Sequence, residues 1–575
     1  MRRSKSQSLQ VSKSQSDSRS LRLYDFTTLR LGAIAIAITL TMTVTSCTTT
    51  HPATPPFDLK IVNGRILDGT GAPWFRGDVG VRGDTIVAIG DLRDAPAKST
   101  IDAQNRLVSP GFIDLLGWSQ TAALSDPLLE AKIRQGVTTE VAGEGDSPGP
   151  QRPNKVTPHS PWITLGDYLD QLDRQGAAIN FAMLLGASNP RSIVIGDVNR
   201  APTADEMREM ERIVDQAMRE GAIGIGSSLI YVPAMYSTTE ELINMSRVAA
   251  KYGGVYFSHI RDEGDRIDSA LDEAFRIGRE AQIPVNIWHL KIGGRPNWGK
   301  MPQIIARIEA ARAEGIDASA NVYPYAASST SLSTLAPDWA MEGGYAEFRK
   351  RLANPDDRAR IAEALKAQVA RRGERGIYVG QIFEESQHIY EKKFIGEIAT
   401  MMNVTPDEAL MTLFAASDTS PRVIFFSMNE DDVRYALKQP WVSVGSDGAS
   451  PSPTTRANNE AVHPRAYGTF ARVLGHYARD EKLFTVEEAV RKMTSQAALR
   501  ANLRDRGVLR EGMKADVIVF DPATVRDVST FEDPHHFSEG VTDVVVNGVA
   551  VLRGGVMTGA TPGKSIRGRG YKPSS

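Results

Sequence analysis

Short apolar runs alternate with segments of helical periodicity through the middle of the chain. Apolar residues recur at three- and four-residue spacing in segments such as 203–220, 238–252 and 301–314, which predicts amphipathic helices. Eight apolar runs predict strands, at 107–114, 138–143, 180–186, 223–228, 254–259, 284–289, 317–322 and 441–447. Alternation of this kind predicts an α/β fold, and eight units favour a TIM-type (β/α)8 barrel.

One long segment interrupts the alternation between the seventh and eighth predicted strands. Residues 335–430 carry helical patterns at 356–371 and 405–416, so we expect a largely helical insertion. Because this segment follows the carboxyl end of a strand, it should lie over the mouth of the barrel, where lids are built.

Both ends of the globular region are rich in strand patterns. The pairs Asn63-Gly64 and Gly83-Asp84 separate alternating apolar runs in 57–106 and predict hairpins, as Asn547-Gly548 does in 505–575. We therefore expect a small β-sandwich domain built from 57–106 and 505–575, flanking a barrel at 107–504. Two unrelated β-caps are the alternative.

The first 56 residues differ from the rest of the chain. Residues 1–30 are rich in Ser, Arg and Lys, and an apolar run at 31–45 leads into Ser46 and Cys47. This order is typical of a bacterial lipoprotein signal peptide at 1–47, followed by a tether at 48–56. Cys47 is the only cysteine, so we expect a lipid anchor there and a place in the bacterial cell envelope. A plain secretory signal with an incidental cysteine is the alternative.

The charge balance argues against one class of partner. The chain has 67 Lys and Arg against 69 Asp and Glu, a formal net charge of -2, whereas nucleic-acid-binding domains are usually strongly basic. We expect no nucleic-acid partner, and contact with a membrane through the lipid anchor alone. The sequence leaves the oligomeric state open.

Polar side chains stand at the predicted carboxyl ends of four strands, where barrel enzymes place their active sites. Glu144, His259 and His289 make a plausible three-ligand zinc set that leaves one position for water. Asp447 is a candidate to accept a proton from that water. The alternatives are structural: hydrogen-bonded buried histidines, a helix N-terminal glutamate and an Asx-turn aspartate.

Several motifs resemble those of one family. HIRDEGD, WHLK followed by RPNWGK, VYPYAASST, VGSDGAS and the opening LVSPGFID are similar to the N-acyl-D-amino-acid deacylase (D-aminoacylase) family of the amidohydrolase superfamily. The similarity runs over most of 57–559. It implies a TIM barrel with a composite β-domain, zinc, and hydrolysis of the amide of a small N-acylated D-amino acid. It also implies that His259 and His289 are metal ligands and that Asp447 is the catalytic acid and base.

The sequence departs from that family at two places. Most amidohydrolases carry His-x-His after the first strand, but this chain has Leu116 and Trp118 there, and neither can bind zinc. The family's metal-binding cysteine after the second strand is also missing, and Glu144 is the available substitute. We therefore expect one zinc ion per chain.

The carboxylate of such a substrate requires a positively charged or hydrogen-bonding partner near the metal. The candidates follow the predicted ligands along the chain: Arg261, Lys291, Tyr323 and Tyr325, with Arg295, Arg465 and His463 as weaker ones. A tyrosine hydroxyl could donate to the carbonyl oxygen as it gains charge. Each of these residues has a surface or structural role as its alternative.

Three functions fit these observations. The leading one is a deacylase of N-acyl-D-amino acids. A dipeptidase or cyclic-amide hydrolase would use the same site. A non-catalytic envelope binding protein would keep the barrel without the chemistry.

Overall fold

The computed structural model describes residues 56–452 and 462–573. The chain divides into two units, residues 1–54 and 55–575, and all described residues belong to the second. The predicted signal peptide, Cys47 and all of the predicted tether except Pro56 lie outside the described residues. Within the described part, no helix is long and apolar enough to span a membrane.

Parallel strands position the candidate site. One sheet has six strands in the order β18-β13-β12-β11-β10-β9, and another has the order β6-β7-β8. Every pair in these two sheets is parallel, which confirms the α/β fold expected from the sequence. The strands are β6 (Phe112–Asp114), β7 (Val137–Ala142), β8 (Asn180–Met183), β9 (Leu185–Gly186), β10 (Gly224–Ser228), β11 (Val255–His259), β12 (Val285–Ile287), β13 (Ala318–Val322) and β18 (Val442–Val444).

The two parallel sheets approach each other at both edges. Leu184 alone separates β8 from β9 along the chain. At the other edge, the Leu115 N–H donates to the Val444 carbonyl over 3.5 Å, and Gly117 forms a parallel bridge with Gly448. The segment that follows β6 therefore lies beside the segment that follows β18.

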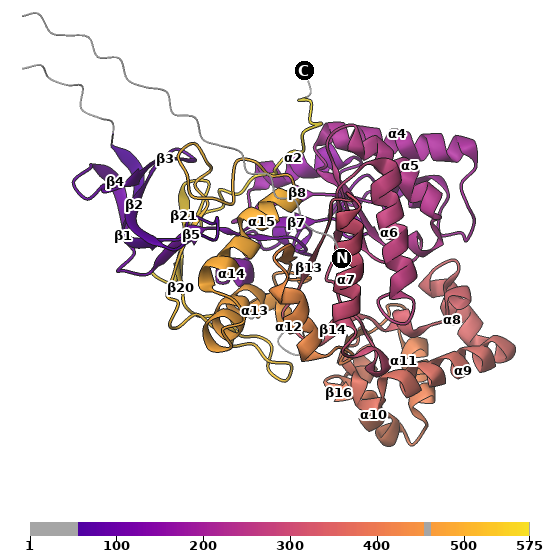
Figure 1. The fold of residues 1–575 in the computed structure, drawn as a ribbon. Helices are drawn as coiled ribbons and strands as arrows, with labels where there is room; N and C mark the ends of the chain where they lie inside the picture. Colours follow the sequence, from indigo (N-terminus) through magenta and orange to yellow (C-terminus); the bar gives the residue numbers. More distant parts are fainter. Residues whose placement is uncertain (1–55, 453–461, 574–575) are drawn as a thin grey trace, which may run out of the picture. The chain divides into compact units, whose positions relative to one another are not determined.

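Helices alternate with these strands along the chain. α4 (Ala204–Glu220), α5 (Thr239–Ala250), α6 (Ile267–Ala281) and α7 (Met301–Ala313) lie side by side in chain order (Figure 1). Thr203 and Glu206 start α4 with a capping box, and Gly221 ends it with a φ of 118°. Apolar faces of these helices pack on the strands in the main core. The region also contains α1 (Glu130–Ile133), α2 (Leu165–Gln175), α3 (Ser188–Val194), α12 (Glu430–Lys438), α13 (Arg465–Arg472), α14 (Val486–Met493) and α15 (Ser495–Arg500).

The first predicted strand is divided between two sheets. Residues 107–114 form β5 (Leu107–Pro110), which pairs with strands of the chain ends, and β6, which pairs with β7. The break falls at Gly111, where a Cβ atom would lie 2.1 Å from Thr138 Oγ1. Only glycine permits this approach, so the prediction of one continuous strand was wrong.

Strands from both ends of the described chain pair in one nine-stranded sheet. Its order is β22-β21-β20-β19-β5-β1-β2-β3, with β4 paired to β1. The two ends join at the antiparallel pair β5 and β19, where Leu107 lies opposite Phe520. The strands are β1 (Phe57–Ile66), β2 (Phe75–Arg82), β3 (Thr85–Gly90), β4 (Ala97–Asp102), β19 (Val517–Phe520), β20 (Val541–Val546), β21 (Val549–Arg553) and β22 (Val556–Met557).

The two Asn-Gly pairs in this sheet behave differently. Asn547 and Gly548 have φ of 47° and 80° and connect β20 to β21 as the predicted hairpin turn. Asn63-Gly64 lies inside β1 instead, at a shift of register against β2 that marks a β-bulge. Asn63 has a φ of 59°, and its N–H donates to Asp78 Oδ1 over 3.0 Å. The hairpin predicted at Asn63-Gly64 was therefore wrong.

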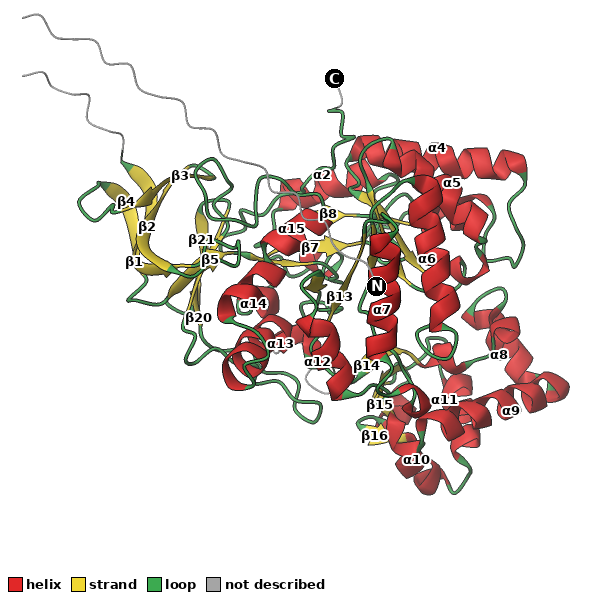
Figure 2. Ribbon diagram, in the orientation of Figure 1, coloured by secondary structure: helices red, strands yellow, loops and turns green. Residues whose placement is uncertain are grey.

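The insertion before β18 contains a sheet as well as helices (Figure 2). Four antiparallel strands pair in the order β14-β17-β15-β16, and the insertion has its own core around Phe348, Leu365 and Phe414. The sequence predicted a largely helical insertion and did not identify these strands, because they are short and separated by long helical segments. The elements are β14 (Ser328–Ser331), α8 (Tyr345–Ala353), α9 (Pro355–Arg372), β15 (Ile377–Gln381), β16 (Lys393–Phe394), α10 (Ile395–Met402), α11 (Pro406–Ala416) and β17 (Arg422–Phe425).

Candidate metal centre and active site

Three predicted ligands meet at the carboxyl ends of parallel strands. Glu144 follows β7, His259 is the last residue of β11, and His289 follows β12 with a φ of 37°. All three side chains are buried. The parallel arrangement directs these strand ends toward the same region, although Glu144 and His289 are separated by 145 residues along the chain.

The geometry of the three residues fits a metal ion. Glu144 Oε1 lies 2.9 Å from His259 Nδ1 and 3.2 Å from His289 Nε2. Ligand atoms of the three residues all lie within 4.8 Å of one another. Tetrahedral zinc with ligands at about 2.0–2.1 Å separates them by about 3.3 Å, so this donor set fits zinc with little movement.

Burial opposes charge on both Glu144 and His259, but their neighbours outweigh it. Burial alone would lower the pKa of His259, whereas Glu263 and Glu144 raise it to about 9. Burial would raise the pKa of Glu144, but the two histidines bring it below its ordinary value. Glu144 is therefore held as a carboxylate, the form that binds metal.

Glu263 contacts both histidines on their other ring nitrogens, and sequence reasoning missed it. Its carboxylate lies 3.0 Å from His289 Nδ1 and 3.4 Å from His259 Nε2. It also accepts a hydrogen bond of 2.6 Å from Lys291 Nζ. Carboxylates in this position orient ligand histidines and fix their tautomers. The one available indication was its place four residues after His259.

Asp447 follows β18 and stands outside the three-residue group. Its Oδ1 accepts a hydrogen bond from the Trp118 indole N–H over 3.0 Å. Its Oδ2 lies 2.7 Å from Arg465 Nη1 in an ion pair, with both side chains largely buried. Asp447 has a φ of 49°, an uncommon conformation for a residue other than glycine.

A buried ionic network fixes the segment around Asp447. Lys132 Nζ donates to Asp114 Oδ2 over 2.6 Å and to Ser446 Oγ over 2.9 Å, and it lies 3.1 Å from Glu140 Oε2. It also donates to the Gly448 carbonyl over 2.8 Å. Ser446 and Gly448 flank Asp447, so the network holds both sides of it. No sequence pattern indicated this role for Lys132.

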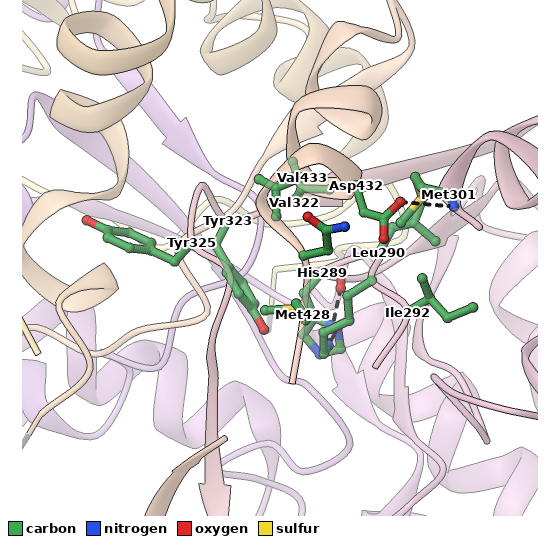
Figure 3. Close-up of a pocket in the computed structure, with 12 residues that line it drawn as sticks. His289, Leu290, Ile292, Met301, Val322, Tyr323, Tyr325, Met428, Asp432 and Val433 are labelled. Carbon is green, nitrogen blue, oxygen red and sulfur yellow. Dashed lines mark hydrogen bonds between the residues drawn. The ribbon is translucent and has the colours of Figure 1, made fainter. Parts of the chain in front are cut away.

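Tyr323 and Lys291 line a pocket together with His289 (Figure 3). The Tyr323 hydroxyl is buried and has no hydrogen-bond partner among the described residues. Burial raises its pKa well above the ordinary value, so it remains a proton donor. The Arg465 guanidinium lies over the Tyr323 ring, 4.7 Å from its centroid. These residues provide a donor hydroxyl and positive charge beside the histidines.

Tyr325 lines the same pocket but points its hydroxyl elsewhere. Figure 3 shows it directed away from His289, and its hydroxyl lies 3.5 Å from Asp527 Oδ2. Its ring packs edge-on against His463 at 5.3 Å. The prediction that Tyr325 contacts substrate has no support from this orientation.

Two predicted substrate residues are not brought to the site. Arg261 forms two hydrogen bonds with Glu273, of 2.8 Å and 2.9 Å. The carbonyls of Met235 and Ser237 accept two more hydrogen bonds from Arg261, which holds it on the α5–α6 side of its loop. Arg295 is exposed and lies over the Trp298 ring. These contacts give no support to the assignment of Arg261 and Arg295 to substrate, which stays a prediction.

The insertion reaches the site through its first residues. His463 Nε2 lies 2.9 Å from the Ala327 carbonyl, and Arg465 Nη2 donates to the Ser329 carbonyl over 3.2 Å. Burial lowers the pKa of His463 well below the ordinary value, so it is a neutral structural residue. These bonds join the start of the insertion to the segment that carries Arg465, the ion-pair partner of Asp447.

Comparison with known proteins identifies the class. The amidohydrolase family model matches residues 355–552. D-aminoacylase of Alcaligenes xylosoxydans xylosoxydans is 38% identical over 523 residues, which cover 89% of this chain and 98% of that protein. N-acyl-D-glutamate deacylase of the same organism is 36% identical and is covered over 93% of its length by 86% of this chain.

A solved structure agrees with these relatives. The N-acyl-D-glutamate deacylase of Bordetella bronchiseptica, crystallised with zinc and a phosphonate inhibitor that mimics the tetrahedral intermediate, superposes with a TM-score of 0.76. The match has 32% identity and covers 89% of this chain and 100% of that one. The chain therefore belongs to the amidohydrolase family, enzymes that hydrolyse amide bonds. Within that family its similarity is to the N-acyl-D-amino-acid deacylases, as the sequence motifs indicated.

Proposed function

We propose that this enzyme hydrolyses N-acyl-D-amino acids to a free D-amino acid and a carboxylate, with one zinc ion per chain. The observation that supports this most is the buried group of Glu144, His259 and His289, whose ligand atoms fit a tetrahedral ion. Family membership supports the enzymatic role and argues against a non-catalytic binding protein.

Each residue of the site has a role in this scheme. Glu144 Oε1, His259 Nδ1 and His289 Nε2 would hold the ion. Zinc bound there would supply Lewis-acid polarisation of the scissile carbonyl and acidify a water molecule. Asp447 would accept a proton as water attacks the carbonyl carbon and return it to the departing amide nitrogen.

The substrate would be oriented by the donors beside the histidines. The Tyr323 hydroxyl, which has no hydrogen-bond partner in the described part of the chain, is suited to donate to the carbonyl oxygen as it gains charge. Arg465 and Lys291 supply positive charge for the substrate carboxylate, and the fork of Arg465 suits it to a bidentate contact. Arg465, a weaker candidate from the sequence, is therefore proposed as a main contact of the substrate carboxylate.

Metal analysis and a substrate panel test the proposal. We expect about one zinc per purified chain, lost in His259→Ala and retained in the control His536→Ala, which alters an exposed histidine paired with Asp533. N-acetyl-D-amino acids should be hydrolysed and their L enantiomers should not. Absence of zinc, or zinc indifferent to His259, would refute the metal site. Preference for dipeptides or cyclic amides would assign the same site to another substrate class.

We also propose three properties that extend beyond this site. The strands of the two parallel sheets close into a barrel, with β8 and β9 counted as one interrupted strand. The contacts between the segments after β6 and β18 support this proposal. The paired chain ends form a separate small domain of residues 57–106 and 505–575, a division supported by their shared sheet. Cys47 carries a lipid that anchors the enzyme in a bacterial cell envelope, which the order of residues before Cys47 supports.

A further inference from the structure

Trp118 occupies a position that joins two distant parts of the chain. Its indole N–H donates to Asp447 Oδ1 over 3.0 Å, across 329 residues of sequence. Its backbone N–H donates to the Gly448 carbonyl over 3.1 Å, and the Asp447 N–H donates to the Leu116 carbonyl over 2.7 Å. Backbone hydrogen bonds therefore fix both residues of the Trp118–Asp447 contact.

Arg465 and Trp118, which both contact the Asp447 carboxylate, differ in their other contacts. Arg465 faces Oδ2, but it also lies over Tyr323, where the substrate carboxylate would bind. A substrate that engages the guanidinium would weaken its hold on Asp447. The indole N–H is neutral and has Asp447 as its hydrogen-bond acceptor. It can hold Oδ1 throughout the reaction without the charge that would make Asp447 a weaker base.

We propose that Trp118 is a positioning residue for Asp447, which it orients through its indole N–H while Arg465 serves the substrate. The inference rests on the proposed function, because it assigns a partner to the proposed proton acceptor. It also gives a role to a residue that otherwise marks only the lack of a strand-one metal ligand. The left-handed conformation of Asp447 supports it, since such a conformation persists only where surrounding contacts enforce it.

The test compares two Trp→Phe variants that each remove one indole N–H from a carboxylate. Trp118→Phe removes the bond to Asp447, which follows β18. Trp441→Phe removes a bond from the residue just before β18 to Glu309. For Trp118→Phe we expect kcat to fall about 10- to 100-fold, the scale of one hydrogen bond to a charged group, with KM within about 2-fold. The acidic limb of its kcat/KM profile should move to higher pH, and its zinc content should not change. Trp441→Phe should match the unchanged enzyme in kcat and in pH profile.

A kcat for Trp118→Phe within about 2-fold of the unchanged enzyme, with the same acidic limb, would overturn the inference. A fluorine spectrum of the 5-fluorotryptophan-labelled chain provides a test without substrate. It should show seven tryptophan resonances, and Asp447→Asn should shift the one that Trp118→Phe removes. An unmoved resonance would also overturn the inference. Absence of deacylase activity together with a shifted resonance would instead reject the proposed function and leave the Trp118–Asp447 contact in place.

Discussion

Replacement of Lys132 by methionine tests the buried network that supports Asp447. The side chains of Lys132, Asp114 and Glu140 are all fully buried. Lys132 is the cation that contacts both carboxylates, and burial alone would lower its pKa, but Asp114 and Glu140 raise it above the ordinary value. Lys132→Met preserves most of the side-chain volume and leaves two buried carboxylates without this partner.

The expected loss of stability is about 3–5 kcal/mol, the scale of breaking a buried ion pair by removing one partner. The loss should depend on pH. Burial raises the pKa of Glu140 above its unfolded value, and Lys132 is the neighbour that lowers it most. Without Lys132 this pKa rises further, so protonation favours the folded variant at low pH and that benefit disappears as pH rises. The variant should therefore be closer to the unchanged protein at pH 5 than at pH 8.

Urea unfolding followed by tryptophan fluorescence at both pH values measures this difference. Lys60→Met is the matched control, because Lys60 is also buried but donates to three backbone carbonyls and not to a carboxylate. Its effect should not change with pH in this range. Lys132→Met/Glu140→Gln should recover part of the loss. A loss below about 1 kcal/mol, or one equal at pH 5 and pH 8, would contradict the ionic role of Lys132.

Three further predictions address the histidines, another buried lysine and the chain start. Glu263→Gln should weaken zinc binding about 10- to 100-fold in a chelator competition, while Glu273→Gln, which alters the partner of Arg261, should leave it unchanged. Burial lowers the pKa of Lys492 from its ordinary 10.5 to about 8, so the unfolded chain binds more protons between these values. The unchanged protein should therefore gain stability relative to Lys492→Met as pH rises from 8 to 10; a constant difference in melting temperature would contradict this. Cys47→Ser should abolish incorporation of labelled palmitate in a bacterial host, and persistent labelling would reject Cys47 as the lipid site.

Periodicity was sufficient to predict the parallel strands but not how the chain divides among sheets. Alternation of strand and helix patterns identified the strands that form the two parallel sheets. It did not reveal the break at Gly111, where the chain passes close to Thr138 on the neighbouring strand β7. The Asn63-Gly64 bulge was missed for a similar reason, since its acceptor Asp78 belongs to β2. Contacts between strands decide such details, and a local pattern does not contain them.

In the candidate site, too, local patterns predicted positions along the chain but not the contacts between side chains. Glu144, His259 and His289 could be predicted from their positions at strand ends, because the parallel arrangement directs all such ends to one face. The same reasoning selected Arg261, two residues after His259, but the direction of a side chain in a loop depends on its neighbours. Glu273 turns Arg261 away, and Glu263 becomes the partner of the histidines. The partner of Asp447 was also unpredictable, since 329 residues separate it from Trp118.

The distribution of charge supports the proposal of a single metal ion and indicates where that ion would bind. Around Asp447, the carboxylates of Asp114 and Glu140 have Lys132, while Asp447 itself has Arg465 and the Trp118 indole. A divalent ion added there would meet two fixed cations and no histidine from the strand-one segment. Around Glu144 the balance is reversed: Glu263 pairs with the fixed cation Lys291, and His259 and His289 lie between Glu144 and Glu263. Glu263 and Glu144 raise the pKa of His259, so a proton on this imidazole balances part of their negative charge. A zinc ion would balance that charge instead and release the proton, which makes the Glu144 side of the site the one that favours a metal.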